Sequence, residues 1–179
     1  MFKSIPTENL SDYVKRESSI THSHSLSYLV SLATAIILRN LITGSSFAQA
    51  VDAALLHRKF QKKNDTLTKF LADIAQDKLI VEVLKDTEGT KLNDGGYSPD
   101  VLRAALYWIR KTDNFTDAVE HSIAFAGPAN YCPVLVGAFA GALYGESSIT
   151  EKNLSKVTKK NPVERVVAVA EALAVDWKK

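Results

Sequence analysis

The side chains best suited to chemistry lie in a short polar interruption between two apolar stretches, residues 127–133 (Gly-Pro-Ala-Asn-Tyr-Cys-Pro). Asn130 offers an amide oxygen, Tyr131 a phenol and Cys132, the single cysteine of the chain, a thiol. A thiol at a helix N-terminus can become a nucleophile because its thiolate is favoured there, but the sequence places no base beside Cys132. We therefore favour the alternative, a buried thiol that packs as a small apolar side chain. Two prolines fix φ angles in this segment, so we expect a rigid turn.

Two histidines separated by one residue, His22 and His24, form a second candidate, expected at the start of a helix. Backbone amides at a helix N-terminus favour a phosphate group. Two histidines without carboxylates nearby are weak evidence for a metal. For His22 the sequence leaves ligand contact and simple capping open. It favours solvent exposure for His24 and His57 and decides nothing for His121.

A third set of polar side chains falls in residues 85–98, which hold Asp, Asn, Thr and three glycines and therefore predict a loop. Asp86, Asn93 and Asp94 could offer oxygens to a cation. Asp, Asn and Gly are also the ordinary residues of turns, and we favour the turn.

The elements that must position these residues are helices, because apolar residues recur at spacings of three and four along most of the chain. The clearest stripe ends at Gly44, a C-terminal stop signal, and Ser46 is the expected cap of the next helix. Asp65 is the expected cap of a third. The stripe of the first of these helices consists of Leu26, Leu29, Val30, Ala33, Ile36, Ile37 and Leu41.

The second half of the chain continues the helical pattern. Pro99, behind Ser98 as cap, opens one helix, and residues 115–126 form another, capped by Asn114 or Thr116. A glycine-alanine helix follows the 127–133 turn, and a last helix begins at Pro162. Only residues 80–83 are ambiguous between helix and strand. The prediction is an all-α fold.

The glycine-alanine helix carries a glycine at every fourth position, Gly137, Gly141 and Gly145. Such spacing leaves one side of a helix bare. We expect close helix packing there, either within the core or against a partner.

The length and composition of the chain limit its domain number and the kinds of partner it can bind. At 179 residues, 46% hydrophobic and 23% charged, the chain fits one globular domain over residues 1–179. A net charge of +2 is far from the basic surface of a nucleic-acid binder. Apolar runs such as residues 35–38 are too short to span a bilayer, and no signal peptide is visible. We expect a soluble, cytoplasmic protein without nucleic-acid or membrane partners.

Three segments, taken in order, resemble the C-terminal half of the ADP-ribosylglycohydrolase domain. The first is Ser-Ser-Ile-Thr-His at residues 18–22 with the helix that follows it. The second runs from Gly-Gly-Tyr-Ser-Pro at residues 95–99 to Asn-Phe-Thr-Asp-Ala-Val at residues 114–119. The third is the 127–133 turn with the glycine-alanine helix. Together they cover roughly residues 15–150, and the resemblance implies a compact multi-helix domain truncated at its N-terminus.

In the family, a Gly-Gly-Asp-Thr-Asp-Thr loop holds two magnesium ions with its aspartates and a threonine. The matching positions here run from Gly127 to Cys132 and contain no carboxylate. The family's other metal loop belongs to the N-terminal half, which we expect this chain to lack. The resemblance therefore implies that the magnesium site is lost, that the chain has no cofactor and that no residue is assigned as catalytic or metal-binding.

The remaining family positions are candidates for ligand contact. The resemblance gives a Thr-His element the task of approaching ADP-ribose, so the candidate residues are Thr21, His22, Gly127, Asn130, Tyr131 and Cys132. The expected function is non-catalytic: binding of a protein partner or an ADP-ribose-like nucleotide, with a homo-oligomer or partner covering the face of the missing half. The alternatives are a hydrolase completed by a separate N-terminal half or using other residues, and a purely structural protein.

Overall fold

The computed structural model describes residues 7–60, 77–156, 168 and 169. These residues form helices joined by short turns and one longer loop, and no strand occurs among them, so the predicted all-α fold is confirmed. The helices are α1 (Thr7–Ser18), α2 (Ser25–Ile42), α3 (Phe47–Phe60), an unlabelled helix at residues 77–85, α5 (Ser98–Lys111), α6 (Phe115–Ala126), α7 (Tyr131–Tyr144), the 3₁₀ turn η1 (Glu146–Ser148) and α8 (Glu151–Lys156).

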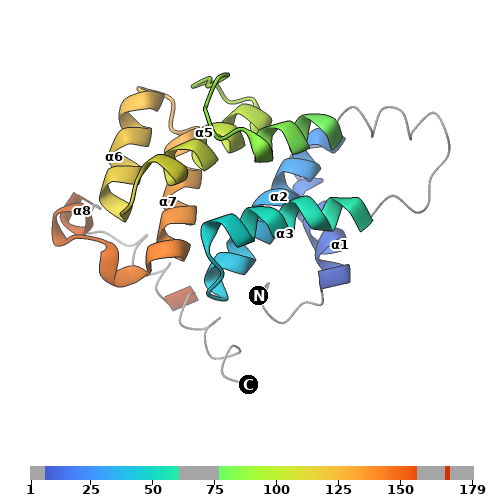
Figure 1. Cartoon of the computed structure of the whole chain (residues 1–179), viewed down its shortest axis with the longest axis horizontal. Helices are drawn as coiled ribbons and strands as arrows, with labels where there is room; N and C mark the ends of the chain where they lie inside the picture. Colours follow the sequence, from blue (N-terminus) through green and yellow to red (C-terminus); the bar gives the residue numbers. More distant parts are fainter. Residues whose placement is uncertain (1–6, 61–76, 157–167, 170–179) are drawn as a thin grey trace.

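Helix α2 is the central element of the core, because it packs against α1, α3, α5 and α7 (Figure 1). By length and composition alone it could also cross a membrane. A core helix that meets neighbours on several sides has the same apolar composition. Its buried residues are Leu26, Val30, Leu32, Ala33, Ile36, Ile37 and Leu41, which include most of the predicted stripe.

The turn from α2 to α3 forms as the local sequence predicts. Gly44 has a φ of 91°, and its N–H donates to Leu41 while that of Ser45 donates to Asn40, the hydrogen bonds of a Schellman motif. Ser46 and Gln49 then form a capping box: the Gln49 N–H donates to the Ser46 hydroxyl, and the Ser46 N–H donates to the Gln49 side chain. This turn lays α3 against α2.

Helices α5, α6 and α7 pack on one another, with α7 against all of α2, α5 and α6. Figure 1 shows α6 and α7 on one side of the molecule and α1 on the other. Asn114 is the observed cap of α6, since its side chain accepts a hydrogen bond from the Asp117 N–H. Of the two caps that the sequence allowed, Asn114 is therefore the correct one.

Two predicted boundaries were wrong. Helix α5 begins at Ser98 and Tyr97 is its N-cap, without a side-chain hydrogen bond, so Ser98 is a helical residue and not the cap. Helix α7 begins at Tyr131, inside the predicted 127–133 turn. Proline is tolerated in the first helical turn because its missing N–H has no partner there, so Pro133 does not delay the helix. The ambiguous residues 80–83 are helical.

Two further predictions fall largely outside the described residues. One is the helix capped by Asp65, which the structure describes only from residue 77 onward. The other is the helix from Pro162, of which only residues 168 and 169 are described, and both are helical and exposed.

The expected close packing of the glycine side of α7 is absent from the described core. A methyl group on Gly137 would meet no atom within 4 Å, and one on Gly141 would meet only Phe115, at 4.0 Å.

Candidate functional site

The turn between α6 and α7 is tight and defined by backbone hydrogen bonds. Gly127 ends α6 with a φ of 54°, where its N–H donates to the carbonyl of Ile123 at 3.1 Å. The Ala129 N–H donates to the Ala126 carbonyl at 3.0 Å, and Asn130 is the N-cap of α7. The turn thus spans only residues 127–130.

The side chains at this turn offer few groups to a ligand. Ala129 has only a methyl group, and the Asn130 side chain makes no capping hydrogen bond, so its amide is exposed to solvent. Tyr131 is 55% exposed, whereas Cys132 is 2% exposed and belongs to the core. Burial raises the pKa of the Cys132 thiol to about 11, so the thiol stays protonated near neutral pH. The turn therefore presents one amide and one phenol, and the buried-thiol alternative is confirmed for Cys132.

Tyr131 also joins this turn to the loop at residues 86–97. A methyl group on Gly96 would lie 3.1 Å from Cε2 and Cζ of Tyr131, so the aromatic ring lies directly on the backbone of this glycine. A side chain at position 96 would have to displace the ring. The loop thus forms a wall beside the start of α7.

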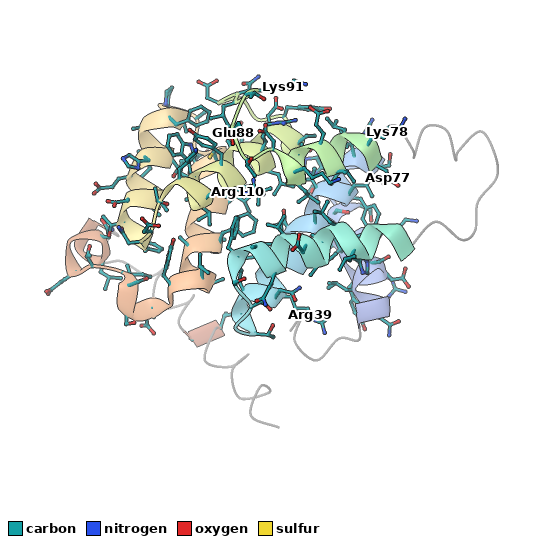
Figure 2. The ribbon with its side chains drawn as sticks, in the orientation of Figure 1. Arg39, Asp77, Lys78, Glu88, Lys91 and Arg110 are labelled. Carbon is teal, nitrogen blue, oxygen red and sulfur yellow. The ribbon has the colours of Figure 1, made fainter. Side chains whose placement is uncertain are left out.

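An arginine pair on α5 anchors the 86–97 loop. Arg103 is buried and donates from Nη1 to Oδ2 of Asp86 at 2.7 Å, and Glu82 lies 3.5 Å from its Nη2. Arg110, seven residues further along α5, donates to the carbonyls of Asp86 and Leu84, both at 2.7 Å. Figure 2 shows Arg110 on α5 and Glu88 with Lys91 on the loop at the upper edge of the molecule.

The sequence reading missed Arg103 and Arg110. Residues seven apart share one face of a helix, and this spacing of two arginines beside an Asp-containing loop was the available signal. The Arg103 hydrogen bond lowers the pKa of Asp86, and the hydrogen bond from Lys91 lowers that of Glu82. These groups stay ionised and hold the loop in place.

The acidic loop residues form turns, as favoured from the sequence. Oδ1 of Asp86 accepts hydrogen bonds from the N–H groups of Glu88 and Gly89, and Oδ1 of Asn93 accepts one from Gly95 at 2.8 Å. These are Asx-type turns. Gly89 has a φ of 66°, and a methyl group on it would lie 2.5 Å from the Tyr107 ring.

The Thr-His element lies in the turn between α1 and α2. Oγ1 of Thr21 and Nδ1 of His22 are 2.8 Å apart, and both side chains are exposed. Helix α2 begins at Ser25, and its cap is His24, whose Nδ1 accepts a hydrogen bond from the Leu26 N–H. The placement of His22 at the helix start is therefore corrected, and the capping role belongs to His24.

The two remaining histidines, His121 and His57, lie beside other side chains of the fold. His121 is exposed and its ring stacks beside that of Trp108, with 5.8 Å between centroids. His57 is half-buried, not fully exposed as expected, and lines a cavity of about 320 Å³ between α1, α2 and α3. The other residues lining that cavity are Leu10, Ile36, Arg39, Asn40, Thr43 and Ala53, none of which is a predicted site residue.

The structure does not bring the two candidate groups together. Thr21 and His22 follow α1, and Figure 1 shows α1 and α6 on opposite sides of the molecule. Among the described residues, no hydrogen bond joins this pair to the α6–α7 turn. The same part of the chain contains no group of three or more His, Cys, Asp or Glu side chains able to hold a metal ion.

Comparison with known proteins places these features in a family. The ADP-ribosylglycohydrolase family model matches residues 1–179. The chain is similar to an ADP-ribosylarginine hydrolase Tri1 of Serratia proteamaculans, with 34% identity over 89 residues that make up 50% of this chain and 24% of the relative. It is also similar to an ADP-ribosylarginine hydrolase Tri1 of Pseudomonas putida, with 28% identity over 140 residues, or 76% of this chain and 38% of the relative. The chain thus spans well under half the length of either relative, and it belongs to the ADP-ribosylglycohydrolase family.

Proposed function

We propose that this protein is a non-catalytic member of its family that acts by binding a protein partner or an ADP-ribose-like nucleotide. One observation carries the proposal: the turn into α7 contains no carboxylate, and its single thiol is buried. Because the chain covers only 24% and 38% of two relatives named as hydrolases, their activity is not transferred to it.

The donor atoms at this turn do not fit magnesium. Mg²⁺ prefers hard oxygen ligands in octahedral geometry and is usually held by one or more carboxylates. Asn130 offers one amide oxygen, Tyr131 a neutral phenol, and Ala129 no donor atom at all. The buried Cys132 thiol is soft and protonated, so it adds nothing to such a site. We therefore derive no step through a metal ion.

The Thr21–His22 pair supports the nucleotide part of the proposal. Both side chains are exposed and lie within hydrogen-bond distance of each other. The pair can present a hydroxyl and an imidazole to the polar groups of a ligand in solution. Among the described residues both side chains remain exposed, and neither has a ring contact like that of His121 with Trp108.

The alternative function is a hydrolase that becomes active only with a separate N-terminal half or through non-family residues. The match of the family model over the whole chain favours it. The composition of the α6–α7 turn opposes it, because adding another polypeptide leaves residues 129–132 without carboxylates.

Magnesium titration by calorimetry tests the non-catalytic proposal. We expect no saturable heat for the whole chain at micromolar to low millimolar Mg²⁺. The variant Asn130→Ala removes the one amide oxygen of the turn and serves as the control. Micromolar binding by the wild type that is lost in Asn130→Ala contradicts the proposal and supports the hydrolase.

Thermal unfolding with ADP-ribose separates the two kinds of partner. A bound ligand at about 100 times its Kd stabilises the fold by roughly 2.7 kcal/mol, which gives a measurable rise in Tm. We expect this rise for the wild type and for Ser23→Ala, but not for His22→Ala. Absence of a shift in all three proteins excludes nucleotide binding and leaves a protein partner.

A further inference from the structure

The cavity between α1, α2 and α3 combines an apolar wall with one permanent positive charge. It has a volume of about 320 Å³. Its apolar lining consists of Leu10, Ile36 and Ala53, and its polar lining of Arg39, Asn40, Thr43 and His57. None of these seven side chains is a carboxylate. Figure 2 shows Arg39 at the lower edge of the molecule, away from the loop that holds Glu88 and Lys91.

The guanidinium of Arg39 lacks the partner that a charge withdrawn from water needs. Its Nη1 is buried without a hydrogen-bond partner, and no ion pair in the described part of the chain involves Arg39. Arginine stays protonated in proteins, so the charge cannot be removed by loss of a proton. Burying a charge is costly unless the charge is paired. An anion in the cavity would offset this cost.

The other arginines of the described helices differ from Arg39 in this respect. Arg103 pairs with Asp86 at 2.7 Å, and Arg110 donates to two backbone carbonyls. Arg16 is exposed to solvent on α1. Of these four arginines, only Arg39 combines partial burial with the absence of an acceptor.

The neighbouring polar side chains of α2 already bond to the helix backbone. Nδ2 of Asn40 donates to the Ile36 carbonyl at 2.8 Å. The Thr43 hydroxyl donates toward the carbonyls of Arg39 and Asn40, both at 3.0 Å. These bonds reduce the negative partial charge that unpaired carbonyls give to a helix C-terminus. The Arg39 guanidinium is therefore the strongest donor that α2 offers to a ligand in the cavity.

We propose that this cavity binds a small organic anion, with its carboxylate or phosphate group on Arg39 and its apolar part against Leu10, Ile36 and Ala53. A guanidinium can donate two parallel hydrogen bonds to either kind of oxyanion. The long arginine side chain has several rotatable bonds, so it can turn its planar fork toward the anionic group. A volume of about 320 Å³ lies at the lower end of the range for ligand pockets, which suits a ligand of about one ring.

This site is separate from the one in the proposed function. Neither Thr21 nor His22 lines the cavity, and no residue of the α6–α7 turn does. The inference therefore goes beyond the proposed function and is tested with different variants.

Calorimetric titration of the whole chain at low salt tests the anion site. The probes are phenyl phosphate and benzoate, with benzamide as the neutral analogue. We expect saturable binding of at least one anion in the millimolar range and none of benzamide. Arg39→Met removes the charge and should weaken anion binding at least about tenfold. The matched control Arg16→Met removes an exposed arginine of α1 and should bind as the wild type does.

Thermal unfolding distinguishes a ligand-binding arginine from a merely structural one. Because Arg39 has no partner in the described part of the chain, we expect Arg39→Met to keep or raise the Tm without ligand. The same variant should lose the rise in Tm that the anion gives the wild type. A second variant, Ala53→Leu, narrows the cavity and leaves the charge in place, and it should also lose this rise.

Four results would overturn the site. They are no saturable binding of either anion to the wild type, equal losses in the two methionine variants, binding of benzamide as tight as that of benzoate, and a large fall in the Tm of ligand-free Arg39→Met. His22→Ala should bind both anions as the wild type does. Failure of the anion site and failure of nucleotide binding at His22 are therefore seen in different variants.

Discussion

Arg103 and Asp86 form a nearly solvent-excluded ion pair, with 2.7 Å between Nη1 and Oδ2 and side-chain exposures of 4% and 9%. The pair joins α5 to the first residue of the 86–97 loop, which in turn lies against Tyr131 at the start of α7. This contact between residues 17 positions apart, together with the Arg110 hydrogen bonds to the carbonyls of Asp86 and Leu84, holds the wall beside the candidate turn.

Breaking this pair should destabilise the fold strongly. Removing one partner of a buried ion pair leaves the other charge uncompensated, which typically costs about 3–5 kcal/mol. We expect Arg103→Ala to lower the free energy of unfolding by about that amount in urea titrations. Lys91→Ala, which removes an exposed ion pair with Glu82 on the same loop, should cost less than about 1 kcal/mol. Equal losses in the two variants would contradict a special role for Arg103.

The same pair should contribute to acid sensitivity. The pKa of Asp86 in the folded chain lies below its ordinary value of 3.8, mainly because Arg103 donates a hydrogen bond to it. A lowered carboxyl pKa stabilises the fold above pH 3.8, and this contribution is lost as the pH falls through the folded-state value. We expect Asp86→Asn to be less stable than the wild type at pH 6 and to lose less stability between pH 5 and 2. Asp52→Asn, on the exposed side of α3, is the matched control for removing one carboxylate from the chain.

The Cys132 thiol should be unreactive in the folded chain. Because burial raises its pKa to about 11 and leaves it 2% exposed, it provides almost no thiolate to a reagent at pH 8. A thiol-specific dye should label the native chain far more slowly than the guanidinium-unfolded chain. Val134→Cys provides the accessible reference, since position 134 is 70% exposed. Labelling of Cys132 as fast as position 134 would show an open, reactive site.

Alanine substitution of two glycines should have opposite effects. Gly89→Ala forces a side chain into a positive φ and against the Tyr107 ring, so we expect a loss of at least about 1 kcal/mol. Gly137→Ala lies within α7 with nothing within 4 Å of the added methyl group, so we expect a gain of roughly 0.5–1 kcal/mol. Urea unfolding of monomeric samples measures both. A destabilising Gly137→Ala would show that a segment of the chain packs on that side.

The candidate site was only partly predictable. The missing carboxylates at residues 129–132 could be read directly, because ligand chemistry depends on residue type. A buried Cys132 is also favoured, because the sequence places no base beside it, and the structure supplies the reason for its burial: α7 starts at Tyr131 and turns that side of the helix inward. The separation of His22 from the α6–α7 turn likewise depends on how α1 and α6 are placed in the fold.

The sequence by itself determined the helices, most of their ends and the family, because helical periodicity, caps such as Ser46 and Asn114, and motif residues act over a few neighbouring positions. Only the tertiary structure decided the Arg103–Asp86 pair, the contact of Tyr131 with Gly96 and which side of α7 is buried, with Cys132 in the core and Val134 exposed. These features join residues far apart in the chain or depend on which side of a helix its neighbours cover. The local sequence pattern determines where a helix begins and ends, whereas tertiary packing determines which of its faces stays exposed to solvent.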